Sequence, residues 1–197
     1  MGASGFIIAV TGMPGSGKST VAKMLSERLG CPLISMGDAV RREVVRRGLP
    51  LTVENVERIA MELRRERGRA AVAYLIRDLV REHFSRGARC VIVDGLRALD
   101  EAEVLREAAE GLCIVAVHAS PSRRLERLLA RGRKDDIKSP EDLRVRDEAN
   151  LSFGIGEVIA LADYMIVNEW GLEELASQVN RVVGELVSGS WKSCGRG

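Results

Sequence analysis

Cysteine, histidine and aromatic residues are all scarce in this sequence. The 197 residues include four cysteines and two histidines, no two cysteines form a C-x-x-C pair, and aromatic residues make up 4%. Zinc sites need closely spaced cysteine and histidine ligands, so this composition argues against a zinc site. Few aromatic rings also argue against a stacking platform for single-stranded nucleic acid.

The cysteines lie in apolar surroundings. Cys31, Cys90 and Cys113 each stand at the start of, or inside, an apolar strand-like run. Free cysteines are among the most buried residue types, and the cytosol keeps thiols reduced. The pattern therefore predicts reduced core cysteines in a cytoplasmic protein.

Long apolar runs and a strong net charge are also missing. The longest runs, such as residues 6–10 and 112–117, are far shorter than the roughly 20 residues that cross a bilayer. The N-terminus lacks a secretory signal, and Phe6 stands where a myristoylation site needs Ser or Thr. The net charge of +2 indicates no global attraction to nucleic acid or membranes. We expect a cytoplasmic protein without membrane contact, and the sequence makes no prediction of its oligomeric state.

Short apolar runs alternate with longer amphipathic segments. Strands separated by helices predict right-handed crossovers and a three-layer α/β fold, with a five-stranded parallel sheet covered on both faces. The expected strands are residues 6–11, 32–35, 89–93, 112–117 and 164–167. The expected helices are residues 19–29, 38–47, 100–110, 121–130 and 172–187, with others that begin at the capping residues Thr52 and Ser139 or end near Phe84.

The first expected strand leads into a glycine-rich segment that matches G-x-x-x-x-G-K-[ST] and opens a helix. Glycines give backbone amides room to approach a phosphate, and the following helix adds the positive end of its dipole. In this motif Lys18 reaches the β- and γ-phosphates of a nucleoside triphosphate, and the Ser19 hydroxyl binds Mg²⁺. The predicted ATP-binding loop consists of Gly12, Met13, Pro14, Gly15, Ser16, Gly17, Lys18, Ser19 and Thr20.

Many functions share this loop, and the rest of the chain narrows them. The Asn-Lys-x-Asp motif with which Ras-type GTPases read guanine is absent from the sequence. Motor proteins and helicases require a much longer chain. The small size and two helical insertions favour a small-molecule kinase.

Further segments resemble adenylate kinases. Ser35-Met36-Gly37-Asp38 followed by Arg41 is similar to their S-T-G-D-x-x-R segment, and Asp94-Gly95-Leu96-Arg97 is similar to a shortened D-G-F-P-R segment. Arg127 and Arg131 match the arginine pair that opens the adenylate kinase lid.

Near its end the chain resembles a second kinase family. Ala162-Asp163-Tyr164-Met165-Ile166-Val167-Asn168 is similar to the segment A-D-Y-V-I-D-N of dephospho-coenzyme A kinases. Over residues 6 to about 187, the whole pattern resembles the archaeal adenylate kinase-related P-loop proteins. The resemblance implies a nucleoside monophosphate kinase-like fold in one domain, residues 1–187, followed by a tail at 188–197.

The resemblance also implies the catalytic and donor-binding roles. Lys18 and Mg²⁺ would neutralise the β- and γ-oxygens of ATP, and Ser19 and Asp94 would hold the metal, Asp94 through water. Arg131 would stabilise charge on the transferring group. Arg127 would stack on the adenine of ATP.

Two helical segments complete the expected site. Residues 36–86 would bind the acceptor, with Arg41 and Arg97 gripping its phosphate and Asp38 either capping a helix or orienting the acceptor. Residues 131–150 would form a basic lid that excludes water from the reaction. Basic residues in or beside this lid are Arg131, Arg133, Lys134, Lys138, Arg144 and Arg146.

Two hypotheses of function follow. The first is a Mg²⁺-dependent kinase that transfers the γ-phosphate of ATP to AMP, another nucleoside monophosphate or dephospho-coenzyme A. The acceptor stays open, because Met36 replaces the usual Thr and the proline of D-G-F-P-R is missing. The second is a regulatory ATP-binding or ATPase protein that contacts RNA through the arginine-rich stretches 41–47 and 64–69.

Overall fold

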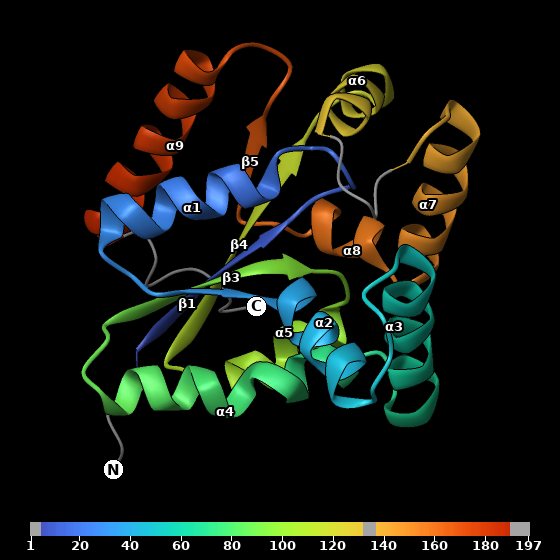
Figure 1. Ribbon diagram of the computed structural model, residues 1–197. Coiled ribbons are helices and arrows are strands. Elements are labelled where there is room, and N and C mark those ends of the chain that lie inside the picture. The colour runs from blue at the N-terminus through green and yellow to red at the C-terminus, as the bar shows by residue number, and fades with distance from the viewer. Residues whose placement is uncertain (1–4, 132–136, 190–197) are drawn as a thin grey trace.

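The predicted α/β architecture is confirmed. The computed structural model describes residues 5–131 and 137–189, and within them five parallel strands form one sheet in the order β2-β3-β1-β4-β5 (Figure 1). The order places β1 at the centre, so the loop that follows it opens at the middle of the sheet edge. The strands are β1 (Phe6–Thr11), β2 (Leu33–Ser35), β3 (Cys90–Leu96), β4 (Gly111–His118) and β5 (Tyr164–Val167).

Helices cover both faces of the sheet, as expected of parallel strands. Alternate residues of β1 enter different cores: Ile7 and Ala9 pack beneath α4 and α5, whereas Ile8 and Val10 pack beneath α1 and α9 (Figure 1). The helices are α1 (Lys18–Leu29), α2 (Met36–Arg46), α3 (Val53–Arg67), α4 (Ala71–Ser85), α5 (Leu99–Arg106), α6 (Pro121–Arg131), α7 (Pro140–Ser152), α8 (Ile155–Ala160) and α9 (Leu172–Val187).

The expected helix caps are present. Thr52 and Ser139 each accept a hydrogen bond from the backbone amide three residues later, and Pro140 takes the first position of α7. Ser35 caps α2 in the same way, which starts that helix two residues earlier than expected. Asp38 therefore lies inside α2 and is not its cap, because the Asp38 amide donates to the Ser35 hydroxyl over 3.2 Å.

Strand β3 is longer than predicted, since it continues through Asp94 to Leu96. The pairing with β1 shifts between Val10 and Thr11, and Gly95 adopts a φ of +106° at this irregularity. Thr11 then donates its hydroxyl hydrogen bond to the Leu96 carbonyl over 2.7 Å. The bulge holds Asp94 inside the strand, opposite the last residues before the phosphate loop.

The six-residue helix α8 was not expected, because it is too short to show a periodic apolar pattern. Residues 36–86, expected as an insertion, form α2, α3 and α4, and α4 packs its buried Ala73, Ile76 and Val80 into the main core. Arg133 and Lys134 of the expected lid lie outside the described residues. Among the residues described, no helix is long and apolar enough to span a membrane.

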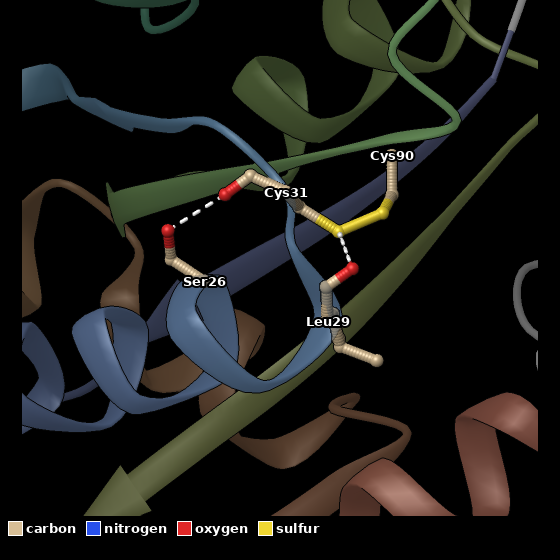
Figure 2. The surroundings of a disulfide bond; sticks show 4 residues. All are labelled: Ser26, Leu29, Cys31 and Cys90. Atoms are coloured by element: carbon tan, nitrogen blue, oxygen red, sulfur yellow. Dashed lines mark hydrogen bonds between the residues drawn. A yellow bond between two sulfur atoms is a disulfide. The ribbon is translucent and has the colours of Figure 1, made fainter.

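The prediction of reduced cysteines is wrong for one pair. Cys31 and Cys90 form a disulfide with their Cα atoms 5.3 Å apart, and the Ser26 hydroxyl donates to the Cys31 carbonyl over 2.6 Å (Figure 2). The two cysteines are 59 residues apart in sequence and become neighbours only because β2 pairs with β3. The bond ties the beginning of the edge strand β2 to its partner strand. Cys113 is buried in β4, as expected.

Reducing this disulfide should destabilise the protein. Cross-linking residues 59 apart restricts the unfolded chain, which stabilises the fold by roughly 2–4 kcal/mol. We expect urea unfolding with and without a reductant to show this difference in the free energy of unfolding. The double variant Cys31→Ser/Cys90→Ser is the control and should match the reduced protein whether or not reductant is present. Equal stability of the oxidised and reduced wild type would contradict the prediction.

Candidate phosphate-transfer site

The candidate site is built on the loop between β1 and α1. Gly12, Gly15 and Gly17 adopt φ angles of +148°, +80° and +96°, which residues with side chains rarely adopt. A Cβ atom on Gly15 would also lie 2.8 Å from the Arg124 carbonyl oxygen, and one on Gly17 would collide with the Asn168 side chain. These glycines are therefore required both by the turn of the loop and by the protein packed behind it.

Carbonyl oxygens of the loop are hydrogen-bonded by the loop itself and by the protein packed behind it. The Ser16 amide donates to the Met13 carbonyl over 3.0 Å, Arg124 Nη1 donates to the Pro14 carbonyl over 3.1 Å, and Asn168 Nδ2 donates to the Ser16 carbonyl over 2.8 Å. A loop that directs amides toward an anion must turn carbonyls away from it, and each buried carbonyl then needs a donor. The arrangement suits a phosphate cradle.

Two of these donors were missed from the sequence. Arg124 looks like one more charged residue of an exposed helix, yet only 4% of it is exposed, and it binds both carboxylate oxygens of Asp147 over 2.7 and 2.6 Å. Asn168 was noticed only as the last residue of a matching segment. Its buried position directly after β5 is a signal that could have singled it out, because polar residues at strand ends often serve the site.

Lys18 and Asp94 interact electrostatically beside the loop. Loss of water around the half-buried Lys18 ammonium lowers its pKa to about 8, and Arg97, Arg146 and Arg131 lower it further, while Asp94 acts in the opposite direction. Asp94 is buried, and its Oδ1 has no hydrogen-bond partner within residues 5–131 and 137–189. A buried carboxylate oxygen in this state is suited to a further cationic or water ligand.

A second group of charged residues, next to Asp94, consists of Arg97, Glu101 and Arg64. Desolvation and the neighbouring Arg64 lower the pKa of Arg97 to about 10, although Glu101 and Asp94 oppose this shift. Glu101 is fully buried, which raises its pKa, but it accepts hydrogen bonds from Arg64 over 3.0 Å and from the Arg97 amide over 2.8 Å. Arg64 and Glu101 were not expected from the sequence, and together they hold the backbone of Arg97 in place.

The remaining predicted residues fall on either side of the loop. Arg41 lies on α2 and contacts Asp38 over 2.7 Å. Arg127 lies on α6, where its Nη2 donates to Asn168 Oδ1 over 3.2 Å, and Arg131 is the exposed last residue of that helix. The positive charge of Arg131 makes a small contribution to the lowered pKa of Lys18.

A cavity of about 540 Å³ adjoins Arg127. It lies between α6 and the segment that joins β5 to α9, and one wall is the largely exposed Trp170. No residue of the phosphate loop lines this cavity, and Arg127 connects the two only through Asn168, which donates to the Ser16 carbonyl. Its other lining residues are Arg123, Glu126, Ala130, Glu169 and Gly171.

Several arginines of the two stretches that suggested RNA contact bind partners within the fold. Arg46 and Arg47 both bind Glu43, over 2.6 and 2.8 Å. Arg64 binds Glu101, and Arg69 contacts the Phe153 carbonyl over 3.1 Å as well as nearby acidic side chains. These contacts account for four of the arginines within the fold, whereas Arg42, Arg65 and Arg67 are exposed.

Comparison with known proteins places the chain in a family. The family described as AAA domain matches residues 11–144, which contain the whole phosphate loop. A UPF0200 protein of Thermococcus kodakarensis, TK1334, is 49% identical over 92% of this chain and 98% of its own length. One of Aeropyrum pernix is 48% identical over 93% of this chain and 95% of its own. The chain belongs to the UPF0200 family.

Solved structures similar to this UPF0200 chain support a P-loop kinase fold. TT1252 from Thermus thermophilus has a TM-score of 0.63 at 26% identity, covering 93% of this chain and 98% of its own. Shikimate kinase from Bacteroides thetaiotaomicron has a TM-score of 0.59 at 22% identity, covering 92% and 98%. A gluconokinase from Sinorhizobium meliloti has a TM-score of 0.52 at 23% identity, covering 96% and 99%. They match a general kinase fold and do not single out adenylate kinases.

The lowered pKa of Lys18 predicts how nucleotide binding depends on pH. Above about pH 8 the free protein loses the Lys18 proton, and a bound triphosphate must restore it, so binding takes up a proton in that range. The Kd for Mg·ATP should be nearly constant between about pH 6.5 and 7.5. It should then rise above pH 8, approaching about tenfold per pH unit.

Isothermal titration calorimetry in buffers of different ionisation enthalpy measures both the affinity and the proton uptake. Lys18→Met, which removes the ammonium, should bind more weakly and show no such rise. A wild-type affinity that stays level up to pH 9 would show that Lys18 keeps an ordinary pKa.

Proposed function

We propose that the protein is a Mg²⁺-dependent phosphotransferase that moves the γ-phosphate of ATP to a small phosphorylated acceptor, in the cytoplasm. The observation that carries the proposal is the glycine-rich phosphate loop after β1, beside which the adjacent strand β3 carries the buried Asp94 and is followed by Arg97. We assign two binding regions around it: the Arg127–Trp170 cavity for the base of the donor, and the group of cations that includes Arg97 for the acceptor. A simple triphosphate-binding protein would need only the first.

The donor half fits ATP. The phosphate loop supplies backbone amides and the start of α1, which together favour the β-phosphate. Arg127 and Trp170 border a cavity large enough for a purine, and both a guanidinium and an indole bind an aromatic base through its face. Lys18 would neutralise charge on the β- and γ-phosphates as the bond to the leaving ADP breaks.

The residues present also fit a magnesium ion. No group of three or more His, Cys, Asp or Glu side chains is placed to hold a metal within the described part of the chain. This suits Mg²⁺, which binds nucleotides through phosphate oxygens, water and one or two protein ligands. Ser19 in the first turn of α1 would be one ligand, and the Oδ1 of Asp94, which lacks a hydrogen bond, would hold a metal-bound water. The ion would offset charge on the transferring phosphoryl group.

The acceptor half favours an anion. Arg97 lies beside Asp94 at the end of β3, and Arg41 lies on α2, which follows the neighbouring strand β2. A guanidinium fork binds phosphate or carboxylate oxygens in two parallel hydrogen bonds. The similarity of Ser35–Asp38, Arg41 and Arg97 to adenylate kinase segments makes a nucleoside monophosphate or dephospho-coenzyme A the first acceptors to test. Shikimate and gluconate, named by the similar structures, are anionic acceptors of a second kind.

The base cavity gives a test of the donor half. Trp170→Ala removes one stacking surface and should raise the Kd for Mg·ATP about tenfold, since stacking on one aromatic residue is worth roughly 1–3 kcal/mol. The Kd for inorganic tripolyphosphate with Mg²⁺ should change less than about twofold, because this ligand has no base. Calorimetric titration of both ligands measures the difference. Equal weakening of both would place the base elsewhere.

Variants of two neighbouring arginines of α2 test the acceptor half. A coupled assay of ADP formation over nucleoside monophosphates, dephospho-coenzyme A, shikimate and gluconate identifies the acceptor. Arg41→Gln should then raise the acceptor KM at least about tenfold, as expected for the loss of a charged hydrogen bond, and leave the KM for ATP nearly unchanged. Arg42→Gln, one position along and exposed, is the matched control and should resemble the wild type. Slow ATP hydrolysis with no acceptor turned over would count against the proposal.

A further inference from the structure

Buried side chains hold both polar atoms of the peptide group that joins Leu96 to Arg97. The Leu96 carbonyl accepts a hydrogen bond from the Thr11 hydroxyl over 2.7 Å, and the Arg97 amide donates to the Glu101 carboxylate over 2.8 Å. Thr11 and Glu101 are both fully buried. Thr11 ends β1 immediately before the phosphate loop, and Glu101 lies in the first turn of α5. This one peptide is therefore fixed from the loop side and from the helix side.

Arg64 of α3 fixes Glu101 in turn. Its Nη2 donates to the other carboxylate oxygen of Glu101 over 3.0 Å, and its guanidinium lies over the ring of Phe153, 4.5 Å from the ring centre. Only 8% of the Arg64 side chain is exposed. A buried carboxylate is stable only when it is paired and its oxygens are hydrogen-bonded, and both oxygens of Glu101 have donors. The backbone of Arg97 thus depends on contacts from α3 and from the end of α7.

The side chain of Arg97 contrasts with its firmly held backbone. It is partly buried, yet its guanidinium makes no hydrogen bond or ion pair with any residue that the structure describes. Arg41, the other arginine assigned to the acceptor half, contacts Asp38 over 2.7 Å. A guanidinium that has lost part of its water without gaining a partner favours binding of an anion. Arg97 therefore combines a fixed backbone with an unpaired cationic group.

We propose that Thr11, Glu101 and Arg64 are positioning residues of the acceptor half. They fix the Leu96–Arg97 peptide, so that the Arg97 guanidinium meets the anionic group of the acceptor in one orientation. A group that is ordered before its ligand arrives loses less entropy on binding, which raises the affinity. The hydrogen bond from Thr11 also ties this acceptor contact to the strand that carries the phosphate loop. The inference rests on the proposed function for the acceptor and its anionic group.

The test uses inorganic phosphate as the probe of the Arg97 site. The full-length protein is first saturated with Mg·AMP-PNP, a non-hydrolysable triphosphate analogue that occupies the donor half. Phosphate binding is then followed by NMR through the side-chain Nε–Hε resonance of Arg97, which is assigned by its loss in Arg97→Lys. Thr11→Val keeps the shape of the side chain without its hydroxyl. It should raise the phosphate Kd about fivefold and change the Mg·AMP-PNP Kd less than about twofold.

Two further variants and one control complete the experiment. Thr11→Ser restores a hydroxyl and should bind phosphate nearly as tightly as the wild type. Glu101→Gln replaces a charged acceptor of the Arg97 amide by a weaker neutral one and should also weaken phosphate binding at least about threefold. Glu103→Gln, two positions along α5 and exposed, is the matched control and should change neither affinity.

Three results would overturn the proposal. The first is a wild-type Arg97 resonance that does not respond to phosphate. The second is a phosphate affinity that stays level in Thr11→Val and Glu101→Gln, or that Thr11→Ser fails to restore. The third is equal weakening of phosphate and AMP-PNP, which indicates a general loss of structure. Phosphate binding needs no turnover, so failure to find a phosphorylated product would contradict the proposed function and leave this result standing.

Discussion

The outward-facing carbonyl groups of the phosphate loop are the constraint on which the rest of the site depends. Amides that face an anion leave carbonyls facing the protein, and a buried carbonyl without a donor costs roughly 1–3 kcal/mol. The donors for Pro14 and Ser16 are Arg124 and Asn168, which come from α6 and from the end of β5. The loop is therefore completed by residues more than 100 positions away, and the fold that brings them together is also what prepares the loop for phosphate.

The charged residues beside the phosphate loop interact with a further set of charged residues. Lys18 interacts electrostatically with Asp94. Next to Asp94, Glu101 accepts hydrogen bonds from the Arg97 amide and from Arg64. Removing one member of a buried pair leaves an uncompensated charge, which is strongly destabilising.

The disulfide between Cys31 and Cys90 fixes the beginning of the edge strand β2, which leads into Ser35 and α2. Disulfides in intracellular proteins are rare, although hyperthermophilic archaea are an exception.

Local signals in the sequence predicted most of the fold and the loop. Alternating apolar runs located all five strands, and the capping residues Thr52 and Ser139 located two helix starts, because these signals act over a few neighbouring residues. The sequence analysis missed the Arg124–Asp147 ion pair, the Arg64–Glu101 ion pair and the disulfide, because the partners of each meet only in the folded chain. A buried arginine and a surface arginine have the same letter, and a helix pattern rich in charge favours the wrong interpretation for Arg124.

The central claim is that the γ-phosphate of ATP goes to another small molecule and not to water. Incubating the protein with Mg²⁺ and ATP labelled with ¹⁸O in the γ-phosphate, in a mixture of candidate acceptors, follows that group directly by mass spectrometry. The account predicts a labelled phosphoryl group on one acceptor with wild-type protein and none with Lys18→Ala. Label that appears only in inorganic phosphate, at the same rate with and without acceptors, would contradict it.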